Sequence, residues 1–123
     1  MGGKDSEVIL TVYVRTGCKT CKRAVDYLAA KKLSFHTIDF FKKPFSKDQI
    51  KSLLKKADVS PQQALRKKDK MFKRLQLDKR KLKDEEILSL MEKYPGLILR
   101  PIVVRGERAT IATKPEMINQ LLA

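Results

Sequence analysis

The spacing of apolar residues changes several times along the chain, and each change marks an expected element. Residues 8–14 (VILTVYV) are mostly β-branched, aromatic or apolar, as in a buried strand. From Cys21 to Ala29, apolar residues recur at the spacing of a helix. Residues 34–39 place apolar side chains among polar ones and predict a second strand. A β-α-β order of this kind implies parallel strands with a right-handed crossover.

The first part of the middle third predicts a capped helix. Ser46 and Gln49 have the spacing of a capping box ahead of an apolar stripe. This helix should end near Asp58. Pro61, directly after Ser60, favours the start of another helix, because proline is tolerated at the first helical position.

The rest of the middle third is also expected to be helical. One apolar face should be buried, formed by Met71, Phe72, Leu75 and Leu77. Asp84 can cap a further helix, which Pro95-Gly96 should end. Together these signals predict an inserted helical layer at about residues 46–94, too small to fold alone.

The last third returns to the spacing of strands. Residues 102–104 and 109–112 flank a turn that contains Gly106, which predicts an antiparallel hairpin. Pro115 begins a last helix with an apolar face. The order β-α-β, helices, β-β-α therefore predicts one α/β domain with a mixed sheet over residues 1–123. Its first seven residues, 1–7, read as a flexible polar tail.

Size and charge narrow the class of protein. A chain of 123 residues is a common size for one domain. It contains no secretory signal and no apolar run near the ~20 residues that span a bilayer, so no membrane association is expected. The net charge of +14 favours encounter with acidic partners or small oxyanions. Because the lysines are scattered and no reading helix is recognisable, direct nucleic-acid binding is not expected.

Cys18 and Cys21 are the candidates for chemistry. They are the two cysteines of the chain, and they follow Gly17 where a strand gives way to a helix. Unpaired N–H groups and the helix dipole at such a position stabilise a thiolate. We therefore expect the pKa of Cys18 to lie below the free thiol value of ~8.5. Cys21, one turn further, can resolve a mixed disulfide or a sulfenic acid.

Two inert buried cysteines, or half of a zinc site, are the alternatives to redox chemistry. A zinc site lacks further ligands, since His36 is the only histidine and no second cysteine pair exists. We therefore expect no bound metal. A lone Cys-x-x-Cys in a chain without a secretory signal indicates a reducing compartment, and we expect the cytoplasm.

Three segments carry a family resemblance. They are residues 11–13 (TVY) with Cys18 just after them, residues 64–67 (ALRK) and residues 94–104 (YPGLILRPIVV), the most specific of the three. They resemble the family that contains glutaredoxin-coupled arsenate reductases and the Spx transcriptional regulators, over about residues 8–122. The resemblance implies a thioredoxin-like core with a helical insert, which agrees with the order of elements above.

The resemblance also implies site residues. Pro101 corresponds to the cis-proline that faces the active cysteine in this family. Arg66 and Arg100 fall where the reductases hold an oxyanion, a task that suits the rigid fork of arginine. Arg108 falls where Spx-type proteins carry an arginine near their cysteine pair. Lys114 stands where the reductases place a third arginine, before a proline.

The chain departs from the reductases around its first cysteine. They follow that cysteine with Gly-Thr-Ser-Arg, whereas this chain has KTCK at residues 19–22. They also precede it with His-Asn, whereas this chain has Val14-Arg15. The second cysteine and Arg108 look closer to the Spx side of the family, where the pair is a redox switch.

Two functions remain open from the sequence. The first is a thiol–disulfide oxidoreductase resembling arsenate reductase, in which Cys18 attacks an oxyanion or a disulfide and Cys21 releases the product. It would hold no cofactor and would depend on an external thiol reductant, either glutathione with glutaredoxin or thioredoxin. The second is an Spx-like redox-sensing transcriptional regulator that binds RNA polymerase. The reactive cysteine and two of the arginines favour the enzyme.

Overall fold

The structure is a computed structural model that describes residues 9–122. The tail predicted over residues 1–7 lies outside the described residues. The chain divides into two compact units. Within the described residues, the first unit combines 9–43 with 100–122, and the second is Pro44–Leu99.

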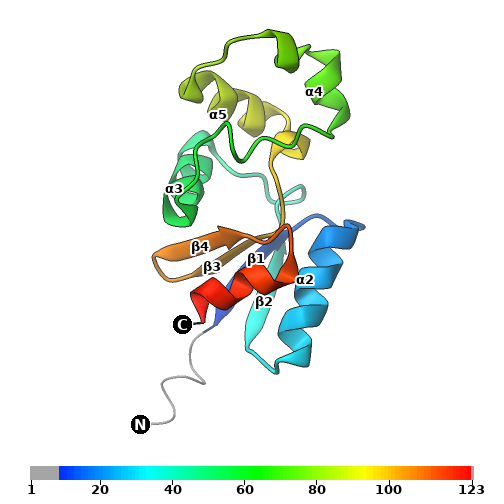
Figure 1. The fold of residues 1–123 in the computed structure, drawn as a ribbon, viewed down its shortest axis with the longest axis vertical. Helices are drawn as coiled ribbons and strands as arrows, with labels where there is room; N and C mark the ends of the chain where they lie inside the picture. Colours follow the sequence, from blue (N-terminus) through cyan, green and yellow to red (C-terminus); the bar gives the residue numbers. More distant parts are fainter. Residues whose placement is uncertain (1–8, 123) are drawn as a thin grey trace. The chain divides into compact units, whose positions relative to one another are not determined.

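The first unit is built on a four-stranded mixed sheet in the order β2-β1-β3-β4 (Figure 1). β1 (Leu10–Val14) and β2 (Phe35–Asp39) are parallel, and α2 (Lys19–Ala30) connects them. β3 (Ile102–Arg105) runs antiparallel to β1 and forms a hairpin with β4 (Arg108–Ile111). The predicted parallel pair and the predicted hairpin are both confirmed.

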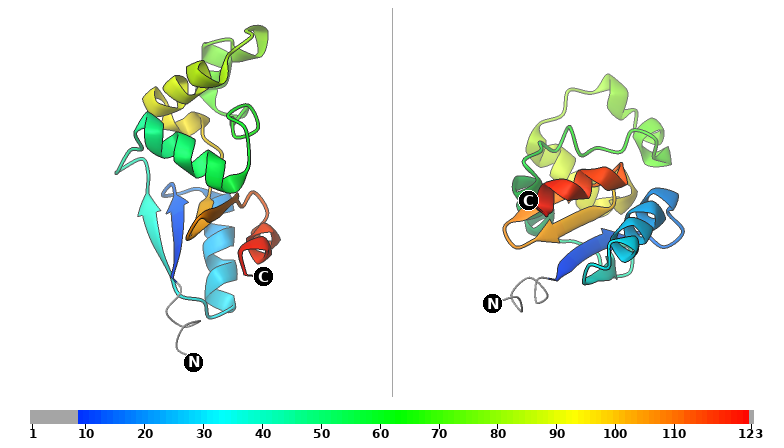
Figure 2. Two further views of the ribbon diagram at one scale, coloured as in Figure 1. Left: turned by 90° about the vertical axis from the view of Figure 1, so that its left-hand side faces the viewer. Right: turned by 60° about the horizontal axis from the view of Figure 1, so that its bottom comes forward.

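Helices α2 and η3 (Pro115–Leu121) cover one face of this sheet, as Figure 2 shows from two further sides. Between them lies an apolar core formed by Leu10, Val12, Ala24, Leu28, Val103, Ala112, Ile118 and Leu121. The hydroxyl of Tyr27 in α2 donates a hydrogen bond to Oδ1 of Asn119 in η3, at 2.7 Å. The last helix forms where Pro115 predicts it, but it is a 3-10 helix rather than an α-helix.

The register of the strands decides which loops share an end of the sheet. Tyr13 of β1 pairs with Ile38 of β2 and with Ile102 of β3. The loops that follow β1 and β2 therefore emerge beside the start of β3. Arg105 and Arg108 pair with each other at the opposite end.

We name the two ends of this sheet by the residues found there. The cysteine end comprises residues 15–18 after β1, residues 40–41 after β2 and residues 100–101 before β3. The hairpin end comprises residues 105–108, the turn between β3 and β4.

The second unit contains the helices α3 (Lys47–Ala57), α4 (Lys70–Arg74) and α5 (Asp84–Lys93). Two 3-10 turns, η1 (Leu77–Lys79) and η2 (Pro95–Leu97), complete it. These elements occupy the region predicted as an inserted helical layer. No helix of the described residues is both long enough and apolar enough to cross a bilayer.

One helix start predicted for this unit is confirmed and another is wrong. Ser46 and Gln49 form the predicted capping box of α3, and Asp58 ends that helix. The prediction of a helix starting at Pro61 is wrong. A single turn forms there, closed by the bond from Ala64 N–H to the Ser60 carbonyl, because the next residues pair with another extended segment.

Two smaller predictions for this unit are also corrected. Asp84 is the first residue of α5 rather than its cap, which is Lys83. In the expected apolar face around α4, only Leu77 is fully buried, at 4% exposure. A helix of five residues is too short to present a continuous apolar stripe.

Candidate functional site

A tight turn delivers the first cysteine to the start of α2. The N–H of Cys18 donates to the carbonyl of Arg15 at 3.1 Å, closing a four-residue turn. Gly17 in this turn has φ +86°, which side chains rarely adopt, although nothing would obstruct a Cβ there. Glycine is therefore required at this position for its backbone conformation and not for space.

Cys18 is the N-cap residue of α2. Its sulfur accepts a hydrogen bond from the backbone N–H of Cys21 at 3.3 Å, as an N-cap side chain does. The partial positive charge of the helix N-terminus thus faces the sulfur, and Lys19 and Lys22 add charge in the first turn. Both cysteines are free thiols, Cys18 half-buried and Cys21 buried.

Arg100 brings a guanidinium to the same sulfur. It is only 6% exposed and precedes Pro101, and the peptide bond between them is cis, the isomer that the family resemblance implies. It interacts with Cys18 through a hydrogen bond and through its charge. Its guanidinium carbon also lies 5.8 Å from the ring centroid of Phe41, and that of Arg15 lies 4.4 Å from the same centroid.

The pKa values of the two thiols are shifted in opposite directions. Burial by itself would raise the pKa of Cys18, but hydrogen bonds from Cys21 and the guanidinium of Arg100 outweigh it, so this pKa is lowered. Burial, followed by the hydrogen bond with the Cys18 sulfur, raises the pKa of Cys21 to about 12. Cys18 is therefore the more readily ionised of the two thiols, and Cys21 keeps its proton near neutral pH.

A carboxylate joins two loops of the cysteine end. Asp39, the last residue of β2, accepts hydrogen bonds from the Thr16 N–H at 3.1 Å and the Thr16 hydroxyl at 2.5 Å. It also accepts one from the N–H of Phe41 at 2.8 Å. The bond from the Thr16 hydroxyl is the main cause that lowers the pKa of Asp39 to about 2. Asp39 is therefore ionised at neutral pH.

A pocket of about 400 Å³ opens beside the cysteines, with lining residues from both α2 and the edge strand β2. It combines the apolar side chains Val14 and Val25 with Cys18 and with the cations Arg15, Lys19 and Lys22. Such a lining suits a small anionic group carried on an apolar body. Within residues 9–122, no three His, Cys, Asp or Glu side chains gather as a metal site.

Of the other predicted arginines, Arg66 belongs to the second unit. Its guanidinium pairs with Asp69 at 3.4 Å, and Asp69 is 8% exposed. A Cβ on Gly96 would come within 2.4 Å of the Asp69 carboxylate, so a side chain there would displace that carboxylate. Gly96 of the most specific motif thus lies against Asp69, the partner of Arg66.

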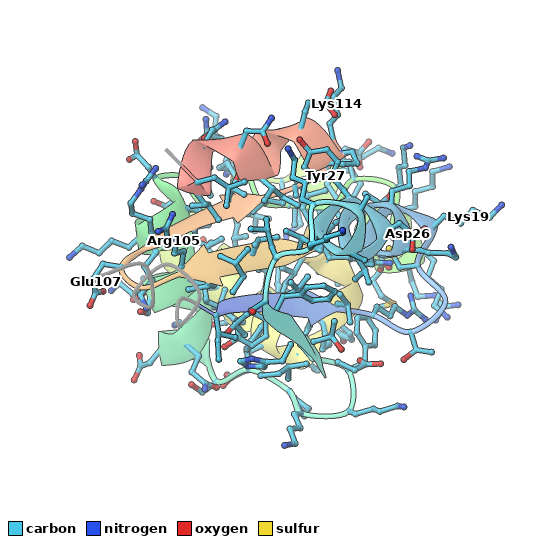
Figure 3. All side chains as sticks on the ribbon, turned by 90° about the horizontal axis from the view of Figure 1, so that it is seen from below. Lys19, Asp26, Tyr27, Arg105, Glu107 and Lys114 are labelled. Carbon is cyan, nitrogen blue, oxygen red and sulfur yellow. The ribbon has the colours of Figure 1, made fainter. Side chains whose placement is uncertain are left out.

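Arg108 lies at the hairpin end of the sheet, apart from the cysteine pair. Its guanidinium donates to the carbonyl of Gln120, and that of Arg105 donates to the carbonyl of Leu121 at 2.5 Å. Figure 3 shows Arg105 and the turn residue Glu107 on one side and Lys19, next to Cys18, on the other. Because strand register places it there, Arg108 has no part in the site at the cysteine end.

Three residues of the site were not singled out from the sequence: Arg15, Asp39 and Phe41. Arg15 directly follows β1, Asp39 is the last residue of β2, and Phe41 lies two residues beyond it, so all three stand at the ends of strands that were predicted. The available signal was the parallel order of β1 and β2, because the ends of parallel neighbours meet at one end of a sheet. That signal brings the residues after both strands together, but it does not tell which of them touch.

Comparisons with known proteins agree on one family. The ArsC family model matches residues 13–121. The global transcriptional regulator Spx of Listeria innocua is 25% identical over 114 residues, which cover 93% of this chain and 87% of that protein. Spx of Enterococcus faecalis is also 25% identical, covering 93% of this chain and 86% of its own.

Solved structures extend the likeness to the fold. The arsenate reductase from Vibrio cholerae superposes with a TM-score of 0.85 and 23% identity, covering 92% of this chain and 97% of that one. A putative arsenate reductase from Yersinia pestis gives a TM-score of 0.81 and 28% identity, covering 90% and 98%. Regulators and reductases thus match the same chain over nearly its whole length.

Proposed function

The chain belongs to the ArsC family, and from that premise we propose that it is a thiol–disulfide oxidoreductase in which Cys18 attacks and Cys21 resolves. The observation that supports this assignment most is the opposite acidity of the two thiols, one lowered and one raised to about 12. A nucleophilic thiol must be deprotonated before it attacks. A resolving thiol should stay protonated and unreactive until the first cysteine has formed its bond to the substrate.

With a disulfide substrate, the reaction follows from these positions. The Cys18 thiolate attacks one sulfur of the substrate, forms a mixed disulfide and releases the other sulfur as a thiolate. Cys21 then attacks the Cys18 sulfur, forms the Cys18–Cys21 disulfide and releases the second substrate thiol, which takes up the Cys21 proton. The substrate gains two electrons, and an external thiol reductant returns two electrons to the protein.

With an oxyanion such as arsenate, the first step is a substitution. The Cys18 thiolate forms a bond to the arsenic of dihydrogen arsenate and displaces one hydroxyl group, which leaves as water after taking the proton of the other hydroxyl, with no change in oxidation state. Cys21 then attacks the Cys18 sulfur, and the electron pair of the sulfur–arsenic bond stays on arsenic, which is reduced by two electrons. The Arg100 guanidinium is buried beside Cys18 and suits the stabilisation of the bound negative charge.

The test is the oxidation of NADPH in the presence of arsenate or a small disulfide, with a glutathione–glutaredoxin or a thioredoxin system as reductant. Turnover should disappear in Cys18→Ser. In Cys21→Ser, the protein should stop at a mixed disulfide on Cys18, detected by mass. Substitution of the exposed Arg23 by Gln serves as a control and should leave turnover unchanged. Absence of turnover with both systems and both substrates would contradict the enzyme.

An Spx-like redox-sensing regulator is the second candidate. The observation that favours it is the set of curated Spx relatives, together with the second cysteine. In that case the Cys18–Cys21 disulfide would change the affinity for RNA polymerase. Binding to purified polymerase should then differ between the oxidised and reduced protein, and a Cys18→Ser, Cys21→Ser double variant should lose that difference.

A further inference from the structure

We propose that Asp39 is the positioning residue of the cysteine end: its carboxylate ties the turn before Cys18 to Phe41 after β2, and so holds the Cys18 sulfur beside Arg100. The inference rests on the proposed role of Cys18 as the attacking thiolate. It assigns Asp39 no contact with the substrate.

The first half of the tie fixes the turn that carries Cys18. Oδ2 of Asp39 accepts both the N–H and the hydroxyl of Thr16, at 3.1 and 2.5 Å. Thr16 lies inside the turn closed by the bond from Cys18 N–H to the Arg15 carbonyl. Two bonds to one oxygen therefore anchor the turn to the end of β2, although Thr16 itself is exposed.

The second half of the tie fixes the aromatic ring beside Arg100. Oδ1 of Asp39 accepts the N–H of Phe41 at 2.8 Å. The preceding residue, Phe40, is fully buried and donates its N–H to the carbonyl of Val14 at 3.1 Å. Two successive N–H groups thus hold the backbone that leads into Phe41, and the guanidinium of Arg100 lies 5.8 Å from the centroid of the Phe41 ring.

The charge of Asp39 and its hydrogen bonds have opposite effects on the acidity of Cys18. The charged groups around Cys18 are the cations Arg15, Lys19, Lys22 and Arg100, with the Cys21 thiol beside them. A nearby carboxylate by itself disfavours a thiolate, so removing its charge alone would make Cys18 more acidic. Removing the tie would instead loosen Cys18 from Arg100 and make Cys18 less acidic. The sign of the change separates the two effects.

The variants are chosen to separate tie from charge. Asp39→Asn keeps the shape but has one acceptor oxygen, so it cannot serve Thr16 and Phe41 together. Thr16→Val removes one hydroxyl with no change in charge, and Thr16→Ser restores that hydroxyl. Asp26→Asn is the matched control, because it removes an exposed carboxylate from α2 that pairs with Lys22.

The experiment measures the alkylation rate of Cys18 by iodoacetamide against pH, in the reduced full-length protein, with mass spectrometry to identify the modified cysteine. Below the midpoint of the wild-type profile, Asp39→Asn and Thr16→Val should react about 2- to 10-fold more slowly, the factor that corresponds to one lost hydrogen bond. Thr16→Ser and Asp26→Asn should not react more slowly than wild type.

Unchanged or faster alkylation in Asp39→Asn would overturn the inference, and if that variant does not fold, Thr16→Val decides in the same way. The result also distinguishes this inference from the proposed function. A wild-type Cys18 that titrates like a free thiol would contradict the proposed function itself. A wild-type Cys18 that is shifted, with the same profile in both variants, would overturn the role of Asp39 alone.

Discussion

Arginines stand at both ends of the sheet in the first unit, and their surroundings give them different roles. At the cysteine end, Arg100 is 6% exposed and acts on the Cys18 sulfur. At the hairpin end, Arg105 and Arg108 donate to main-chain carbonyls at the end of η3. Arg100 therefore lowers the pKa of a thiol, whereas Arg105 and Arg108 complete a helix terminus.

The difference comes from the helix end that each arginine meets. The cysteine end presents the N-terminus of α2, where free N–H groups favour an anion, and Arg100 adds to that field. The hairpin end receives the C-terminus of η3, where free carbonyls need donors. An arginine in a sequence thus acquires its role only when the neighbouring helix terminus is known.

The largest effect is expected from a substitution at the cysteine end. Arg100→Gln removes a buried guanidinium from Cys18 and should slow alkylation of Cys18 below its midpoint by about 10-fold or more, as for a hydrogen bond to a charged group. The pH profile of iodoacetamide labelling measures it. Arg105→Gln is the control, and an equal slowing in that variant would show that the two ends do not differ as described.

An intermediate effect is expected at the hairpin end. The double variant Arg105→Gln, Arg108→Gln leaves carbonyls of η3 without their donors, and should lower the free energy of unfolding by about 1–2 kcal/mol. Urea unfolding measures this change. Cys18 labelling should keep its wild-type pH profile in the folded double variant, and a shifted profile would contradict the separation of the two ends.

The smallest effect concerns stability at acid pH. Because folding lowers the pKa of Asp39 from 3.8 to about 2, its contribution is present above the unfolded value and is lost as pH falls between them. Unfolding midpoints between pH 5 and pH 2 should therefore fall less steeply in Asp39→Asn than in wild type. Identical slopes would mean that the carboxylate makes the same interactions in the folded and unfolded chain.

Much of the fold was predictable from the sequence because its signals are local. Short apolar runs located the four strands, helical spacing located α2, and the Ser46–Gln49 box located the start of α3. The helix at Pro61 failed for the opposite reason. Its cap signals are present, but Leu65 pairs with Ile98, far along the chain, and that pairing ends the turn.

The cysteine pair was likewise readable from the sequence, since a thiol at a strand-to-helix junction depends on residues only a few positions apart. The family motif added Arg100 and Pro101, which both lie at the cysteine end. It did not locate Arg108, because a motif does not state the strand register that carries Arg108 to the other end of the sheet.

The sequence by itself therefore determined most of the elements, the position of the cysteine pair and the family, all of which depend on short-range patterns. Only the tertiary structure decided the partners of that pair. Asp39 meets Thr16 because the parallel strands β1 and β2 end side by side, and Arg100 lies near Phe41 because the antiparallel strand β3 begins at that same end. No spacing along the chain contains that information.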